Sequence, residues 1–277
     1  MIARACCVCG SQEIRPLLVD HQVPVGRCAE CGFIYCVRVP EAAALAIHYT
    51  ESYADADGWL REMQFNRQLI FPLGLEQLRQ LGAAGRLLDV GCSVGLFLVA
   101  ARDAGFEVRG VELSPAPARF AREHFGLEVF TGTLRESPLE PASFEVVTLW
   151  DVLEHLPDPR AALSDIACLL RPGGVLAVRV PDGEFHLWKI RLLRPWFGRR
   201  FTWFDVPNHL NHFRPHTLAR LLDAAGFTVE RVRPGAPHLW NKPLDWFKLR
   251  YYRAAELMTD CLGWQVGNCF EVYARRR

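Results

Sequence analysis

Six of the ten cysteines lie within the first 36 residues, and four of them form two matching pairs. Cys6-x-x-Cys9 and Cys28-x-x-Cys31 are each followed directly by glycine. A CxxC turn presents two thiolates on one tight reversal, and two such turns supply the four sulfur ligands of a tetrahedral zinc ion. The spacing therefore predicts a closed, structural zinc site at Cys6, Cys9, Cys28 and Cys31. Four thiolates leave no position open for catalysis.

Two further cysteines, Cys7 and Cys36, lie close enough in sequence to compete for the metal. A reactive dithiol is the alternative interpretation of the pairs. We expect residues 1–40 to form a small module in which zinc replaces the hydrophobic core that so short a segment cannot build.

A second chemical motif lies in residues 87–95, with the sequence LLDVGCSVG. A buried strand that runs into small residues and then a helix lets the backbone approach a ligand at the helix N-terminus. Glu112 ends the next expected strand about 20 residues on, where an acid can hold ribose hydroxyls. A dinucleotide fingerprint would need glycine at positions 91, 93 and 96, but Ser93 and Leu96 depart from it. No Gly-Lys-Ser/Thr follows, so an ATP-binding loop is excluded as well.

Alternating strands and helices must position these motifs. Short apolar runs bounded by turn signals predict strands at 86–90, 108–111, 128–130, 144–149, 175–180, 227–232 and 268–274. Helical periodicity predicts helices at 41–49, 59–81, 95–104, 117–125, 160–170 and 217–225. This order predicts an α/β fold with a doubly wound, mostly parallel, seven-stranded sheet. We expect connecting helices in residues 41–84 and the main domain in residues 85–277.

Composition narrows the class of protein. Half of the 277 residues are apolar and the formal net charge is +1, which indicates a globular chain and weakly disfavours nucleic acid as a partner. No apolar run reaches the roughly 18 residues of a membrane span, and no signal peptide is recognisable. We expect a cytoplasmic protein.

Three ordered motifs make the chain resemble the class I S-adenosylmethionine-dependent methyltransferases. LLDVGCSVG resembles their glycine-rich loop, with Ser93 at the middle glycine. FEVVTLWDVLEHL at 144–156 resembles their fourth strand and its continuation, with Glu145 where Asp is more usual. LRPGGVL at 170–176 resembles the turn into their fifth strand. The resemblance covers about residues 85–182 and implies the Rossmann-like methyltransferase fold with S-adenosylmethionine as cofactor.

The resemblance also implies a set of cofactor contacts at the ends of strands. Gly91, Ser93 and Gly95 would line the methionine part, and Asp89 would orient the loop. Glu112 would take the ribose, with Leu113 beside the adenine. Thr133 and Leu134 would border the adenine from the next strand. Trp150 and Asp151 would close over the sulfonium side. For the apolar members of the set, simple packing is the alternative.

Histidines are the candidates for acceptor chemistry. His155 follows the fourth strand and resembles a histidine that contacts the acceptor in related enzymes, where it could serve as a base. The segment PNHLNHFRP at 207–215 resembles a segment that follows the fifth strand in one branch of the family. Its His209 and His212 would contact acceptor or cofactor, or else cap the helix that follows.

Residues 184–204 combine five basic residues with many aromatic ones, and no acid occurs between Phe185 and Phe204. We expect a lid insertion at about 183–215. Its basic face could recognise a phosphate-bearing acceptor, make peripheral contact with a membrane, or simply be solvated.

These features favour methyl transfer to an oxygen or carbon of a small molecule, such as a sugar nucleotide, another carbohydrate or a secondary metabolite. One alternative is an RNA base methyltransferase that grips RNA with its zinc module. Another is a degenerate fold that only binds ligands. The sequence does not specify the acceptor, the methylated atom or the oligomeric state.

Overall fold

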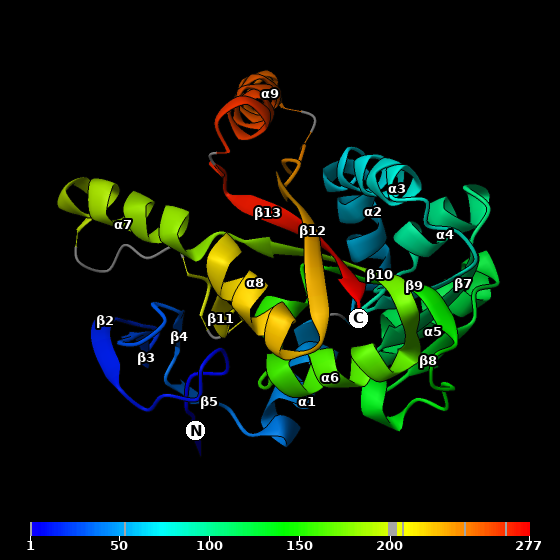
Figure 1. Ribbon diagram of the computed structural model, residues 1–277, viewed down its shortest axis with the longest axis horizontal. Helices are drawn as coiled ribbons and strands as arrows, with labels where there is room; N and C mark the ends of the chain where they lie inside the picture. Colours follow the sequence, from blue (N-terminus) through cyan, green and yellow to red (C-terminus); the bar gives the residue numbers. More distant parts are fainter. Residues whose placement is uncertain (1, 53, 199–203, 207, 241, 264) are drawn as a thin grey trace.

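A seven-stranded sheet forms the centre of the computed structural model, which describes residues 2–52, 54–198, 204–206, 208–240, 242–263 and 265–277 (Figure 1). The strand order is β12-β13-β10-β9-β6-β7-β8. The strands are β6 (Arg86–Val90), β7 (Glu107–Glu112), β8 (Val129–Thr131), β9 (Phe144–Trp150), β10 (Leu170–Pro181), β12 (Phe227–Pro234) and β13 (Cys269–Arg276). Only β13 runs antiparallel to its neighbours in this sheet. The predicted α/β fold with a mostly parallel, doubly wound sheet is confirmed.

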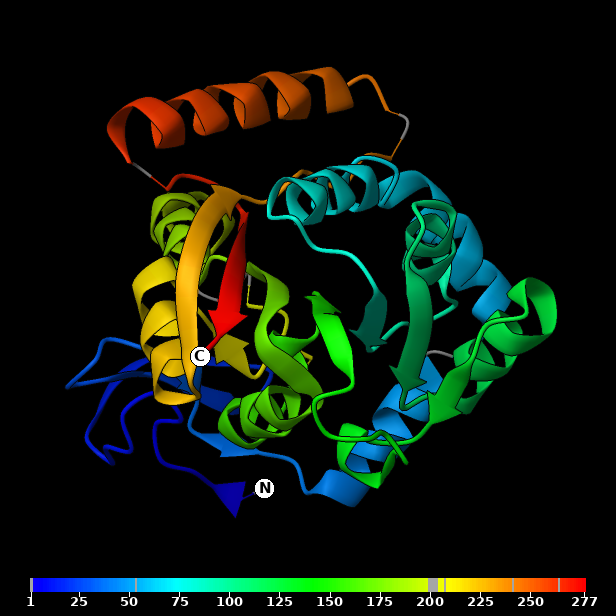
Figure 2. The ribbon, with the colours of Figure 1, turned by 45° about the vertical axis from the view of Figure 1, so that its right-hand side comes forward.

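Helices cover both faces of the sheet. Successive residues of a strand point to opposite faces, so each strand contributes apolar side chains to a core on either side. Leu87 and Val146 pack into a core with α2 (Ala56–Asn66), α3 (Ile70–Gln80), α4 (Leu96–Asp103) and α5 (Pro115–Phe125). Leu88 and Val147 pack into a second core with α6 (Pro159–Leu169) and α8 (Pro215–Ala224). Figure 2 shows the helices on either side of the strands.

The N-terminal module is a four-stranded antiparallel sheet, in the order β11-β4-β3-β2. Three strands come from the module itself: β2 (Ile14–Asp20), β3 (Val23–Cys28) and β4 (Ile34–Cys36). The fourth, β11 (Asn211–His212), comes from the other end of the chain and pairs with Ile34 and Tyr35. Two short strands, β1 (Ile2–Ala3) and β5 (Arg38–Val39), form a separate pair. The expected boundary at residue 40 is therefore too simple, because the module is completed by a distant strand.

The helices that precede the sheet differ from the prediction. After α1 (Ala42–Ser52), the single helix expected at 59–81 is broken into α2 and α3. Helix α2 ends at Asn66, where the amide of Arg67 still donates to the carbonyl of Met63. Pro72 lies in the first turn of α3, where proline is typical of a helix start, and the prediction of one continuous helix overlooked this signal.

Two helices project from the body of the molecule, α7 (Gly183–Phe197) and α9 (Asp245–Leu262) (Figure 1). The inner face of α7 packs Leu187 and Ile190 against the N-terminal module. Part of the expected lid, residues 199–203 and 207, lies outside the described residues. None of the helices in the described part of the chain is both long and apolar enough to cross a bilayer.

Candidate functional site

A cavity of about 710 Å³ opens at the carboxyl ends of β6, β7, β8 and β9. Helices α1 and α2 provide one wall, and another is provided by Asp205, Asn208, His209, His238 and Cys269. Ligands bind at this edge in open α/β sheets, and the volume is in the range of small-molecule sites. The cavity is therefore the candidate site, and the predicted residues can be placed against it.

The glycine-rich loop forms the floor of the cavity. Gly91 and Gly95 have φ angles of 72° and 83°, which favour glycine. A Cβ at Gly91 would lie 2.6 Å from the side chain of Val152, and one at Gly95 would lie 2.5 Å from Leu127. Ser93 also adopts a left-handed conformation, with φ 49°, and its buried hydroxyl has no hydrogen-bond partner among the described residues. The loop thus keeps a left-handed backbone although Ser93 replaces the middle glycine.

Glu112 ties this loop to the next strand. One carboxylate oxygen accepts a hydrogen bond from the amide of Ser93 at 2.8 Å, and the other accepts from the amide of Ser114 at 2.7 Å. Burial raises the pKa of Glu112, and these backbone donors oppose the rise. A carboxylate has further acceptor capacity beyond these two bonds, and Glu112 lines the cavity. The residue can therefore shape the loop and still meet a ribose.

Asp89 and Gly95 support the loop without lining the cavity. The buried carboxyl of Asp89 accepts a hydrogen bond from the hydroxyl of Thr148 at 2.6 Å. Burial raises the pKa of Asp89 to about 8. Asp89 thus joins β6 to β9 below the site.

The expected adenine-side residues Leu113, Thr133 and Leu134 all line the cavity. Thr133 caps the short helix η1 (Leu134–Glu136), since its amide and hydroxyl both donate to Glu136. Trp150 also reaches the cavity, but its ring packs mainly in the core, with its centroid 5.1 Å from that of Phe97. Its indole N–H has no partner among the described residues.

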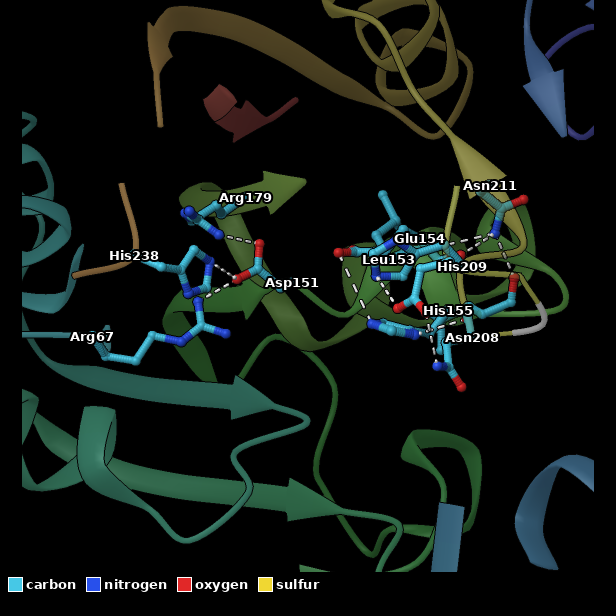
Figure 3. Close-up of polar contacts among 12 residues, drawn as sticks. Arg67, Asp151, Leu153, Glu154, His155, Arg179, Asn208, His209, Asn211 and His238 are labelled. Atoms are coloured by element: carbon cyan, nitrogen blue, oxygen red, sulfur yellow. Dashed lines mark hydrogen bonds and ion pairs between the residues drawn. The ribbon is translucent and has the colours of Figure 1, made fainter. Parts of the chain in front are cut away.

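Asp151 is the centre of a charge cluster that the sequence did not indicate (Figure 3). It has a φ of 56° and accepts hydrogen bonds from Arg67 and from the fully buried Arg179. Nε2 of His238 lies 3.8 Å from the same carboxylate. Burial opposes charge on Asp151, but Arg179 and Arg67 outweigh it and hold its pKa below the ordinary value. These partners come from the residue that follows α2, from β10 and from the segment before α9, so sequence spacing could not connect them.

His155 ends the short helix η2 (Leu153–His155) and lines the cavity. Its Nδ1 is 2.9 Å from the carbonyl oxygen of Asn208, and its ring is edge-on to that of His209 at 4.7 Å between centroids (Figure 3). Burial, with His209 second, lowers the pKa of His155 to about 3. The imidazole is therefore neutral at physiological pH.

Glu154 lies beside His155, fully buried, with neither carboxylate oxygen hydrogen-bonded among the described residues. Burial and the charge of Asp151 raise its pKa well above the ordinary value. One ligand atom each from Glu154, His155 and His209 lies within 4.8 Å of the others, so these three groups could also hold a divalent cation.

The two histidines of the 207–215 segment separate in the structure. His209 lines the cavity, and burial lowers its pKa to about 4. His212 does not line the cavity: it belongs to β11, is buried, and its ring centroid is 4.2 Å from that of Phe204. Neither caps α8, because Arg214 and Thr217 form that cap. The structure thus corrects the expected substrate contact of His212.

The expected lid is also corrected. Among its described residues, none from 183 to 198 lines the cavity; only residues 205, 208 and 209 do. The basic and aromatic side chains of α7 are therefore not among the residues that line the cavity.

The four cysteines of the two CxxC turns converge. Their sulfurs lie within 4.8 Å of one another, with Cys6 to Cys31 and Cys9 to Cys28 both at 3.4 Å. Zn–S bonds of about 2.3 Å imply sulfur–sulfur edges of about 3.8 Å in a tetrahedron, so the donor set fits zinc. The two competing cysteines are not part of this cluster, and Cys36 donates instead to the carbonyl of His209 at 3.6 Å.

Known proteins with a similar sequence are methyltransferases. A family model described as a methyltransferase domain matches residues 46–232. A ubiquinone biosynthesis O-methyltransferase of Azoarcus sp. is 36% identical over 179 residues, which cover 59% of this chain and 77% of that protein. For the same-named protein of Idiomarina loihiensis the identity is 32%, and the match covers 50% of this chain but only 60% of that relative.

Solved structures share the fold. A methyltransferase from Thermotoga maritima superposes with a TM-score of 0.56 at 19% identity, over 81% of this chain and 97% of that one. Together with the family model and the glycine loop at the sheet edge, this places the chain in the class I S-adenosylmethionine-dependent methyltransferase family.

Proposed function

We propose that this protein transfers a methyl group from S-adenosylmethionine to an oxygen of a small-molecule acceptor. The observation that carries the proposal is a single cavity with the glycine loop and Glu112 on one side and the neutral imidazole of His155 on another. The relatives named ubiquinone biosynthesis O-methyltransferase support oxygen over carbon as the acceptor atom.

The residues present fit this cofactor. Gly91 and Ser93 line the cavity, Gly95 shapes the loop behind them, and Glu112 offers acceptor sites for ribose hydroxyls. Leu113, Thr133 and Leu134 would border the adenine, and Trp150 with Asp151 would face the sulfonium side. Arg67, held by Asp151, supplies a cation for the carboxylate of the methionine part. Asp89 would support the loop from beneath the cavity without contacting the cofactor.

The cofactor supplies a methyl group on a sulfonium that already carries a good leaving group, so the protein's main task is orientation. His155 has its Nδ1 proton committed to the Asn208 carbonyl, which leaves the Nε2 lone pair to accept from an acceptor hydroxyl. With a pKa of about 3 it is a weak base, so it orients the hydroxyl more than it removes the proton. His209, on the same wall, adds a second polar contact.

The acceptor class is a narrower proposal. A hydroxyl-bearing carbohydrate, sugar nucleotide or secondary metabolite fits a cavity of this size. Phosphate recognition loses its main support, because α7 does not line the cavity. RNA is disfavoured as well, since two of the module's arginines are used internally: Arg4 donates to the carbonyl of Leu210, and Arg27 pairs with Glu184 at 2.7 Å.

We also propose that Cys6, Cys9, Cys28 and Cys31 bind one structural zinc ion. The support is the convergence of four sulfurs on two glycine-ended turns.

The deciding experiment combines binding with product analysis. Calorimetric titration should show saturable binding of S-adenosylmethionine and none of NAD. Incubation with methyl-labelled cofactor and a panel of hydroxylated acceptors should then give products with labelled methoxy groups. Binding of NAD alone would refute the methyltransferase assignment, and label on carbon or nitrogen only would refute oxygen as the acceptor.

A further inference from the structure

Exposed apolar side chains are concentrated on the two projecting helices. Trp188, Trp196 and Phe197 on α7, and Trp246, Phe247 and Leu257 on α9, are all more than half exposed. Trp196 reaches 84%. Elsewhere in the described chain such side chains occur singly, as at Val19 and Phe65. Large exposed apolar patches mark surfaces that another molecule covers.

Each helix is held to the body by its opposite face, so the exposure is a fixed feature of the fold. Leu187 and Ile190 of α7 are buried against the N-terminal module. Tyr252 and Ala255 of α9 are buried, and Glu256 is bound by Arg233 of β12. The outward faces are therefore presented by anchored helices.

The two helices meet at Phe185. Its ring centroid is 5.7 Å from that of Trp188 on α7 and 6.5 Å from that of Tyr251 on α9. Figures 1 and 2 show both helices at the periphery of the molecule. We call the outward side chains of α7 and α9 the two-helix surface.

Positive charge accompanies the aromatic residues. Arg191 on α7 and Arg250 and Arg253 on α9 are exposed, and the guanidinium of Arg250 lies 4.8 Å above the ring of Trp246. The only acid of α7, Glu184, is taken by Arg27 and Arg214. Aromatic rings beside arginine suit the headgroup region of an anionic bilayer, where rings enter the interface and cations meet lipid phosphate. A second copy of this chain would instead set these cations against each other.

We propose that the two-helix surface docks the protein on the surface of an anionic phospholipid bilayer. The contact is peripheral, with the helices lying on the membrane. Both helices are attached through residues of the cavity wall: Pro181 and Asp205 flank the α7 segment, and His238 and Cys269 flank the α9 segment. The bilayer is thereby held beside the cavity.

Co-sedimentation of the full chain with vesicles tests this. Vesicles of phosphatidylcholine with 30% phosphatidylserine (about that fraction suffices for a negative surface) should pellet the protein, and pure phosphatidylcholine should pellet much less. Raising salt from about 0.1 to 0.5 M should weaken binding because the headgroup attraction is screened. Tryptophan emission should shift to the blue on binding.

Three variants sharpen the test. Trp196→Ser/Phe247→Ser should reduce the apparent affinity at least about tenfold by removing inserted apolar area. Arg191→Gln/Arg253→Gln should reduce it severalfold and lessen the salt dependence. The matched control, Arg119→Gln/Arg220→Gln, removes two exposed arginines of α5 and α8 and should leave binding unchanged.

Failure of the wild type to pellet with anionic vesicles would overturn the proposal. Equal loss of binding in the control pair would also overturn it, because it would show a nonspecific charge effect. Concentration-dependent dimers in sedimentation velocity, abolished by Trp196→Ser/Phe247→Ser, would identify a second copy as the occupant instead. None of these outcomes depends on methyl transfer.

Discussion

Nδ1 of His155 donates a hydrogen bond to the carbonyl oxygen of Asn208 at 2.9 Å, and a carbonyl can only accept. This contact fixes the tautomer of His155 and leaves Nε2, which lies 4.0 Å from Oε1 of the buried Glu154, as the acceptor nitrogen. The same stretch of chain is held by the residue that precedes β11, since the amide of Leu210 donates to the carbonyl of Glu154 at 2.9 Å. The orientation of His155 thus depends on residues more than fifty positions away.

His155→Ala should lower kcat by about 100-fold, in the range for loss of a positioned polar catalytic group, while the Kd for S-adenosylmethionine stays within about twofold. Steady-state kinetics on the identified acceptor and calorimetry provide the two readouts. The control His21→Ala changes an exposed histidine outside the cavity. Unaltered kcat in His155→Ala would remove the residue from the mechanism.

Glu112→Gln should weaken cofactor binding by more than tenfold. Both carboxylate oxygens accept from backbone amides, so an amide group would set one N–H against another and disturb the loop as well as the ribose contact. Calorimetry measures the loss, and Glu107→Gln at the exposed start of the same strand is the control. Equal affinity in both variants would contradict the assigned role.

Asp151→Asn should lower stability by about 3–5 kcal/mol, because it leaves the buried charge of Arg179 without its principal partner. Chemical denaturation measures the change. Asp165→Asn, at a more exposed acid of the cavity wall, should cost little. Adding Arg179→Met to Asp151→Asn should recover part of the lost stability. If the free energy of unfolding of the double variant instead falls by the sum of the two single losses, Asp151 and Arg179 are not coupled as described.

The buried histidines should make acid unfold the protein, and His186 offers a clean test. Burial lowers its pKa in the folded state to about 3, against about 6.5 when unfolded. Between those values the unfolded state binds the extra proton, so this residue's contribution to stability is lost as pH falls below about 6.5, by up to about 1.4 kcal/mol per pH unit.

His186→Gln should therefore flatten the dependence of unfolding free energy on pH between 6.5 and 5, relative to the wild type. Parallel curves for His186→Gln and the wild type would show that His186 titrates normally in the folded protein.

Removal of zinc should affect activity as well as folding. Metal analysis should give about one equivalent per chain, lost in Cys28→Ser/Cys31→Ser, whose Tm should fall. Activity should fall too, since Cys36 of β4 donates its amide to the carbonyl of Leu210 next to the His155 support. Cys168→Ser, an exposed cysteine outside the cluster, is the control. Full metal content in the double variant would contradict the site.

Local patterns were sufficient for the strands and the glycine loop. The run Arg86–Val90 is apolar, short and followed by Gly91, so its strand and turn follow from neighbouring residues alone. The same holds for the cysteine turns. Such features depend on a few adjacent residues, and the structure places them as the pattern indicates.

Features that depend on contacts between residues far apart in the sequence could not be predicted. Arg67, Arg179 and His238 look like ordinary polar residues in sequence, and only the fold brings them to Asp151. Strand β11 is two residues long and exists because β4 offers an edge. The outward course of α7 is likewise set by its packing on the module.

The pairing of β4 with β11 also has a consequence for synthesis. Ile34 and Tyr35 leave the ribosome roughly 175 residues before Asn211 and His212, which is on the order of ten seconds or more at ordinary elongation rates. Throughout that interval β4 is an open edge, supported only by its own hairpin and by the zinc ion proposed for the four cysteines. The chain is then most exposed to misassembly during translation, before β11 covers the edge of β4, and a supply of metal matters more at that stage than in the finished enzyme.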